Sequence, residues 1–90
     1  MVYVVLCGLP GHWGTSHVWR SFRVACRNAD VEPEFADVTT GDPRADDVEV
    51  VPTIRVYAED DPYGEPLAEH RGATTGEEIR ALIERGKALV

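Results

Sequence analysis

Val-Val-Pro-Thr-Ile-Arg-Val-Tyr, at positions 50–57, is the stretch of this chain that decides the fold. A β-branched pair precedes Pro52, and an apolar, β-branched segment follows it directly, which is typical of a strand. Proline has no backbone N–H, so within a sheet it is confined to the first residue of a strand or to an edge. The tertiary amide of Val51–Pro52 also makes a cis bond far cheaper than at a bond that does not precede proline. The stretch therefore predicts a strand that begins just after Pro52.

The first third of the chain predicts a strand, a loop and a helix. Val2–Cys7 is a continuously apolar, β-branched run, which is typical of a central strand covered on both faces. The loop at 11–17 leads into a helix that runs to about Ala29, and Thr15 or Ser16 is its expected N-cap.

Two faces of this helix differ in character. One face is apolar at the helical period, which predicts that it is buried. Its members are Val18, Phe22, Ala25, Cys26 and Ala29. Another face carries Arg20, Arg23 and Arg27, spaced at i, i+3 and i+7. Such a run is either a solvated helix face or a docking stripe for an acidic partner, and the sequence leaves both open.

The middle of the chain continues with a second strand at Glu34–Val38. A strand, a helix and a strand in so few residues predict a parallel, right-handed βαβ unit. The polar segment 39–49 has room for one helical turn at Pro43–Val48. A hairpin loop at 60–66 then connects the third strand to a short, charged edge strand at Leu67–Arg71.

The last segment predicts a second helix. Thr74 with Glu77, or Thr75 with Glu78, forms a capping box at its start. An apolar stripe, expected to be buried, follows at Ile79, Leu82, Ile83 and Leu89.

The third strand places Arg55 and Tyr57 on one side of the sheet and its aliphatic residues on the other, because side chains alternate along a strand. With only one helical turn at 43–48, we expect this polar side to be thinly covered. One possible consequence is self-association through the Arg55/Tyr57 face.

Length and charge restrict the possibilities. A chain of 90 residues predicts one domain, spanning 1–90. The net charge of −7 argues against nucleic acid and against an anionic membrane as partners. No segment has the roughly 18–20 apolar residues that a membrane-spanning helix needs. The apolar start lacks the features of a signal peptide, and we expect a cytoplasmic protein.

The order of these segments resembles the thioredoxin/glutaredoxin superfamily. An apolar first strand is followed by a loop containing Trp13, Val51-Pro52-Thr53 resembles the cis-proline turn, and Gly72 matches a family glycine after the last strand. The resemblance implies an α/β, thioredoxin-like fold: a four-stranded mixed sheet (βαβ, then ββα) with helices, a reduced second helix and a cis bond before Pro52.

The catalytic signature of that superfamily is missing. Where the family has Cys-X-X-Cys, this chain reads Gly14-Thr15-Ser16-His17, and a glutaredoxin-like register at His12 and Thr15 also finds no thiol. Dithiol exchange requires an attacking thiolate. Cys7 and Cys26 fall at positions predicted to be buried, where thiols react poorly.

Other chemistry in the loop is weakly indicated. A serine at a helix start, such as Ser16, is far more often a cap than a nucleophile. Two histidines, His12 and His17, without a third ligand are weak support for a metal. We therefore expect no catalytic residue, no metal and no cofactor.

The leading hypothesis is a redox-inactive thioredoxin-like module for protein binding or assembly, with a protein or an extended peptide segment as its partner. In the family, the cis-proline loop offers backbone hydrogen bonds to an extended segment, a form of strand addition. The expected groove consists of His12, Trp13, Gly14, Thr15, Ser16, His17, Val51, Pro52 and Gly72. The alternative is a thiol-disulfide oxidoreductase or a glutathione-using enzyme that works through Cys7 or Ser16.

Overall fold

A computed structural model describes all 90 residues of the chain. In chain order the elements are β1 (Val2–Gly8), α1 (Trp13–Asn28), β2 (Pro33–Asp37), β3 (Thr53–Ala58), β4 (Ala68–Arg71) and α2 (Gly76–Lys87). The strands form one sheet in the order β2-β1-β3-β4. β1 pairs parallel with β2, while β1–β3 and β3–β4 are antiparallel. The predicted α/β class, with a four-stranded mixed sheet, is confirmed, and the arrangement is compatible with a thioredoxin-like fold.

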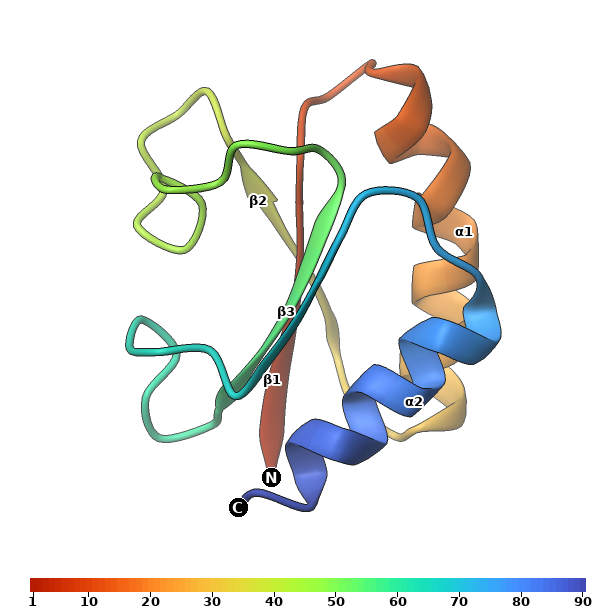
Figure 1. Cartoon of the computed structure of the whole chain (residues 1–90), viewed down its shortest axis with the longest axis vertical. Coiled ribbons are helices and arrows are strands. Elements are labelled where there is room, and N and C mark those ends of the chain that lie inside the picture. Colours follow the sequence, from red (N-terminus) through yellow and green to blue (C-terminus); the bar gives the residue numbers. More distant parts are fainter.

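Both helices cover the same face of the sheet, which we call the helix-covered face (Figure 1). Thirteen buried apolar residues fill the space between the helices and the strands, among them Leu6, Phe22 and Ile83. α2 approaches β3 closely at Gly86, where an added Cβ would lie 2.4 Å from Cγ1 of Val56. Burial of this apolar surface is the main stabilising contribution to the fold, at about 25 cal/mol per Å².

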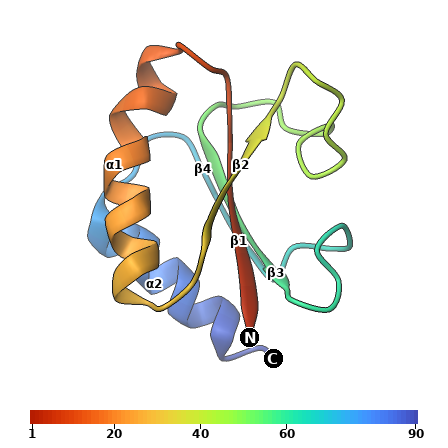
Figure 2. The same ribbon diagram turned by 180° about the vertical axis from the view of Figure 1, so that it is seen from behind.

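Irregular chain covers the opposite face of the sheet, which we call the turn-covered face (Figure 2). The expected helical turn at Pro43–Val48 does not form. Two successive turns replace it, in which the N–H of Ala45 donates to the carbonyl of Asp42 (2.9 Å) and the N–H of Val48 to that of Ala45 (3.2 Å). A second, smaller apolar cluster joins these turns to the sheet: Ala45 of the turns packs with Val5, Cys7, Ala36 and Tyr57 of the strands.

The prediction of a thinly covered Arg55/Tyr57 side is wrong. Arg55 is 5% exposed and Tyr57 is 2% exposed. Both side chains donate hydrogen bonds to the main-chain carbonyl of Arg44, at 3.0 and 3.3 Å, which holds the segment 39–49 against the sheet. A self-association face made by these two side chains therefore has no basis, because neither is available at the surface.

The boundaries of α1 also differ from the prediction. The helix begins at Trp13, with His12 at the N-cap, rather than after Thr15 or Ser16. Thr15 is buried inside the helix, and its hydroxyl accepts a hydrogen bond from the N–H of Leu9 (3.2 Å). The threonine therefore ties the helix to the end of β1 instead of capping it.

The capping box of α2 is formed by Thr75 and Glu78, one of the two predicted pairs. Leu89 is 61% exposed, so its predicted burial is wrong, because α2 ends at Lys87. The edge strand β4 begins at Ala68, one residue later than expected.

The two termini lie at the same end of the molecule (Figure 1). There, Met1 and Val90 line one shallow hollow together with Glu59 and Asp60. The loops that precede α1 and β3 lie at the other end. Neither helix is both long and apolar enough to cross a bilayer.

Candidate functional site

The turn before β3 is fixed by hydrogen bonds on both sides of Pro52. The Val51–Pro52 peptide bond is cis. The hydroxyl of Thr53 donates to the carbonyl of Val50 at 2.5 Å. The N–H of Gly72 donates to the carbonyl of Pro52 at 2.7 Å. Gly72 has a φ of +87°, a left-handed conformation that favours glycine, so this residue type is required where the chain leaves β4.

The first turn of α1 packs against the same turn. A Cβ added at Gly14 would lie 3.2 Å from Cε1 of His12 and 3.5 Å from Cδ of Pro52. Gly14 therefore lies beside Pro52, close enough that a methyl group at this position would be in ordinary van der Waals contact with the proline ring. Four predicted groove residues, His12, Gly14, Pro52 and Gly72, are in this way brought together from three separate parts of the chain.

Trp13 and His17 form a separate pair on the outside of α1. Their rings stack with centroids 5.3 Å apart and an interplanar angle of 11°. The Trp13 side chain is 79% exposed, and His17 and Ser16 are exposed as well. These residues are next to the Pro52 turn in sequence, but their side chains belong to the outer surface of the helix.

Thr15 does not belong to the groove. A Cβ added at Gly8 would lie only 2.5 Å from Cγ2 of Thr15, so this side chain faces the end of β1. Thr15 thus has a structural role, as its hydrogen bond to Leu9 shows.

Val51 contributes main-chain groups that have no partner. Neither its N–H nor its carbonyl oxygen makes a hydrogen bond within the chain. Val51 itself is half-buried, and the neighbouring Val50 is 45% exposed. The end of the molecule therefore presents a free peptide donor and acceptor beside an exposed aliphatic side chain.

The two thiols lie on opposite faces of the sheet. Cys7 belongs to the cluster on the turn-covered face and Cys26 to the core on the helix-covered face. Burial raises the pKa of Cys7 to about 11 and that of Cys26 to about 12. Both are free. The sheet between them prevents a disulfide, and at neutral pH neither thiol supplies much thiolate.

Sequence reasoning missed a polar pocket beside the Pro52 turn. This cavity of about 80 Å³ is lined by Asp47, Val48, Glu49, Thr53, Arg55, Glu69 and Arg71. Inside it, Arg55 donates to Glu69 at 2.7 Å and to Asp47 at 2.8 Å. The only indication of this pocket in the sequence was Arg55, a charged residue within an otherwise apolar strand. The same pattern is also expected if the arginine faces solvent, which is how the sequence was interpreted. The charged side chains that line this pocket are therefore already engaged in ion pairs with one another.

No three histidine, cysteine, aspartate or glutamate side chains lie close enough together to hold a metal ion. Comparison with known proteins finds no matching family model and no significant match among curated proteins. The fold and the site together define a small α/β domain with a four-stranded mixed sheet. Its most distinctive end is made by the Pro52 turn, the start of α1 and Gly72.

Proposed function

We propose that this protein is a thioredoxin-like module that binds an extended segment of another protein at the Pro52 turn, without thiol chemistry. The observation that carries the proposal is the unpartnered N–H and carbonyl of Val51, beside a turn that Gly72 and Thr53 hold in place. An extended peptide pairs with such groups as an added strand does, through main-chain hydrogen bonds. Because the turn is already fixed, little order has to be gained on binding.

The side chains near the turn add contacts to this main-chain recognition. Val50, which is 45% exposed, offers an aliphatic contact next to the free peptide groups. Trp13 is largely exposed and precedes Gly14, the residue in van der Waals contact range of Pro52. Exposed aromatic residues of this kind contribute much of the binding free energy at many protein interfaces.

The positions of the two sulfur atoms support the proposal that the protein works without thiol chemistry. The start of α1 carries no cysteine, and both thiols are buried with raised pKa values. A disulfide-reduction assay with dithiothreitol as the electron donor tests this half of the proposal. We expect a rate equal to that of dithiothreitol alone, and a clearly faster rate contradicts it.

The binding half is tested with peptides selected from a displayed random library against the folded protein. We expect the selected peptides to shift the amide resonances of Val51 and Gly72, and Trp13→Ala to weaken binding about tenfold or more. Tyr63→Ala is the matched control, because Tyr63 is also an exposed aromatic residue but lies in the loop between β3 and β4. Failure to select any peptide, or shifts confined to residues far from Pro52, would contradict the proposal.

A further inference from the structure

Positive charge is distributed very unevenly over this acidic protein. α1 contains Arg20, Arg23 and Arg27 and no acidic residue. Because the net charge of the chain is −7 and α1 contributes +3, the rest of the chain carries −10. None of these three arginines forms an ion pair, whereas Arg44, Arg55 and Arg71 all do.

The outward side of α1 has a regular spacing. Trp13, His17, Arg20, Val24 and Arg27 are separated by four, three, four and three residues, and we call them the α1 stripe. At 3.6 residues per turn they lie on one side of the helix, opposite the buried Phe22. All five are exposed. This spacing is that of the a and d positions at which one helix packs against another in a coiled coil.

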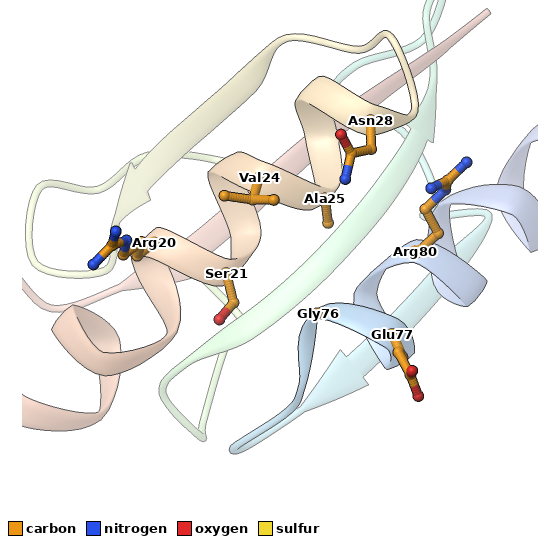
Figure 3. Close-up of a pocket in the computed structure, with 8 residues that line it drawn as sticks. All are labelled: Arg20, Ser21, Val24, Ala25, Asn28, Gly76, Glu77 and Arg80. Atoms are coloured by element: carbon orange, nitrogen blue, oxygen red, sulfur yellow. The ribbon is translucent and has the colours of Figure 1, made fainter.

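Hollows flank the α1 stripe on both sides. A groove of about 400 Å³ separates α1 from α2 and is lined by Arg20, Ser21, Val24, Ala25, Asn28, Gly76, Glu77 and Arg80. Figure 3 shows Arg20 on α1 at one side of this groove and Arg80 on α2 at the other. A second hollow, of about 440 Å³, lies on the other side of the stripe and is lined by Trp19, Arg20, Arg23, Val24 and Arg27.

Val24 is the ridge between the two hollows. It lines both of them, and it is 45% exposed although it is aliphatic. A helix packed along the stripe would therefore find an apolar contact at its centre and guanidinium groups around it. Packing of ridges into grooves is the ordinary geometry of such helix pairs.

We propose that the α1 stripe, together with Arg23 in the hollow beside it, docks an acidic amphipathic helix of a partner protein. Arg20, Arg23 and Arg27 are spaced at i, i+3 and i+7, so they rise by roughly 4.5 and then 6 Å along the helix axis. Glutamates at the same spacing on a second helix match this ladder, with a leucine or similar side chain against Val24.

Charge also disfavours the other occupants. A second copy of α1 would place arginine against arginine, because α1 has no acidic residue to offer. A nucleic acid would be repelled by the −10 charge carried by the rest of the chain. The matching occupant is therefore a helix with carboxylates on one face, and we assign it to a different chain; docking of the acidic part of a second copy is an outcome that the test below distinguishes.

The test uses a fluorescein-labelled synthetic helical peptide of roughly 18 residues, long enough to be helical in water. It carries glutamates at i, i+3 and i+7 with leucines on the same face. A scrambled peptide of equal composition and a peptide with lysine in place of glutamate are its controls. We expect the full-length protein to bind the acidic peptide at least tenfold more tightly than the scrambled one, and more weakly as salt is added.

Two variants locate the binding. Arg23→Glu/Arg27→Glu should lower the affinity at least tenfold, and Val24→Asp should lower it similarly, with the fold checked by circular dichroism. Arg85→Glu, a change at an exposed, unpaired arginine of α2, should leave the affinity within about twofold. Amide shifts should follow α1 from residue 20 to residue 27.

Three results would overturn the proposal. They are equal binding of the scrambled peptide, unchanged affinity of the Arg23/Arg27 variant, and tighter binding of a single-stranded DNA or of a second copy of the chain than of the acidic peptide. This surface shares Trp13 with the peptide groove but not Pro52, Arg23, Val24 or Arg27: Pro52→Ala should weaken the peptides selected at the groove and leave the acidic helix unaffected. The two proposals can therefore fail separately.

Discussion

The two faces of the sheet are covered in physically different ways. On the helix-covered face, two amphipathic helices bury thirteen apolar residues. On the turn-covered face, four buried residues of the sheet pack with Ala45 of a segment that has no helix, and two arginines hold that segment in place. A sheet with little apolar area to bury on one side can therefore still be covered, if a buried arginine such as Arg55 donates to a main-chain carbonyl of the covering segment.

Arg44 and Arg55 together hold the segment 39–49 against the turn-covered face. The Arg44 side chain donates to Asp42 at 2.7 Å and to the hydroxyl of Tyr3. Its main-chain carbonyl accepts hydrogen bonds from Cys7, Arg55 and Tyr57. Each arginine thereby connects the sheet to the segment 39–49, and every buried side-chain nitrogen and oxygen has a partner.

The largest effect is expected from breaking the helix-covered face. Phe22 is 0% exposed in the core between α1 and the sheet. Phe22→Ala should lower the free energy of unfolding by about 3–5 kcal/mol, because it removes apolar contacts and leaves a cavity. Urea unfolding followed by circular dichroism measures this, with Phe22→Leu as a milder control. A loss below about 1 kcal/mol would show that the helices contribute little to this core.

A somewhat smaller effect is expected from breaking the turn-covered face. Arg55→Met should cost about 3 kcal/mol, because it leaves the partly buried Glu69 with Arg71 as its only partner and removes a donor to the carbonyl of Arg44. This cost is at the low end of the range for breaking a buried ion pair, because the carboxylate of Asp47 stays in contact with water. Arg85→Met is the matched control and should change stability by less than about 0.5 kcal/mol. Equal effects of the two substitutions would contradict the role of Arg55.

Thiol labelling sharpens the comparison, because each face contains one cysteine. Single-thiol proteins, Cys26→Ser and Cys7→Ser, are treated with an excess of a thiol reagent in native buffer. Cys7 should be labelled about tenfold faster than Cys26, since it becomes accessible when the segment 39–49 opens locally, whereas Cys26 requires separation of α1 from the sheet. Faster labelling of Cys26 would reverse the proposed order of stability of the two faces.

The smallest effect is the acid sensitivity of the turn-covered face. Hydrogen bonds from Arg44 and Arg55 hold the pKa values of Asp42 and Asp47 below their ordinary 3.8. Burial opposes the ionisation of Glu69, but bonds from Arg71 and Arg55 outweigh it and lower its pKa below 4.5. Because these pKa values are lower in the folded state, the stabilisation is complete above about pH 4.5 and is lost as the pH falls through the folded-state values.

Urea unfolding at a series of pH values measures this loss. The free energy of unfolding should be nearly level from pH 7 to 5 with respect to these groups and should fall below that. The Arg55→Met variant should show a shallower fall, because Asp47 and Glu69 each lose the Arg55 hydrogen bond that lowers their pKa, although Glu69 keeps the one from Arg71. Identical slopes for the variant and the unaltered protein would count against the assignment.

The helix-covered face could be predicted from the sequence, and the turn-covered face could not. Periodicity located the buried side of α1 at Phe22 and Cys26, and the two possible capping boxes located the start of α2 at Thr74 or Thr75, of which Thr75 is the N-cap. No such period marks Arg44, whose role depends on contacts with Tyr3 and Tyr57, far away in the sequence. Reasoning from alternation alone placed Arg55 at a poorly covered surface, when its hydrogen bonds make it part of the interior.

The candidate site was predictable to a similar extent. The turn at Pro52 follows from a residue type that only certain positions of a sheet accept. The place of Gly72 beside it came from the resemblance to a family, and the hydrogen bond from its N–H to the carbonyl of Pro52 was not predicted. The orientation of the side chains at the start of α1 was not predicted either, because it depends on the residue at which the helix begins. With the start at Trp13 rather than after Thr15, Thr15 faces β1 and Trp13 faces outward.

The meeting of the two chain ends, beside Glu59 and Asp60, has an architectural consequence. A domain whose ends come together can be spliced into an exposed loop of a host protein, or circularly permuted through a short bridge between Met1 and Val90, with little disturbance of its interior. The Pro52 turn lies at the far pole and would remain unobstructed by either fusion. A fusion through the two chain ends therefore leaves both proposed contact surfaces accessible to a binding partner.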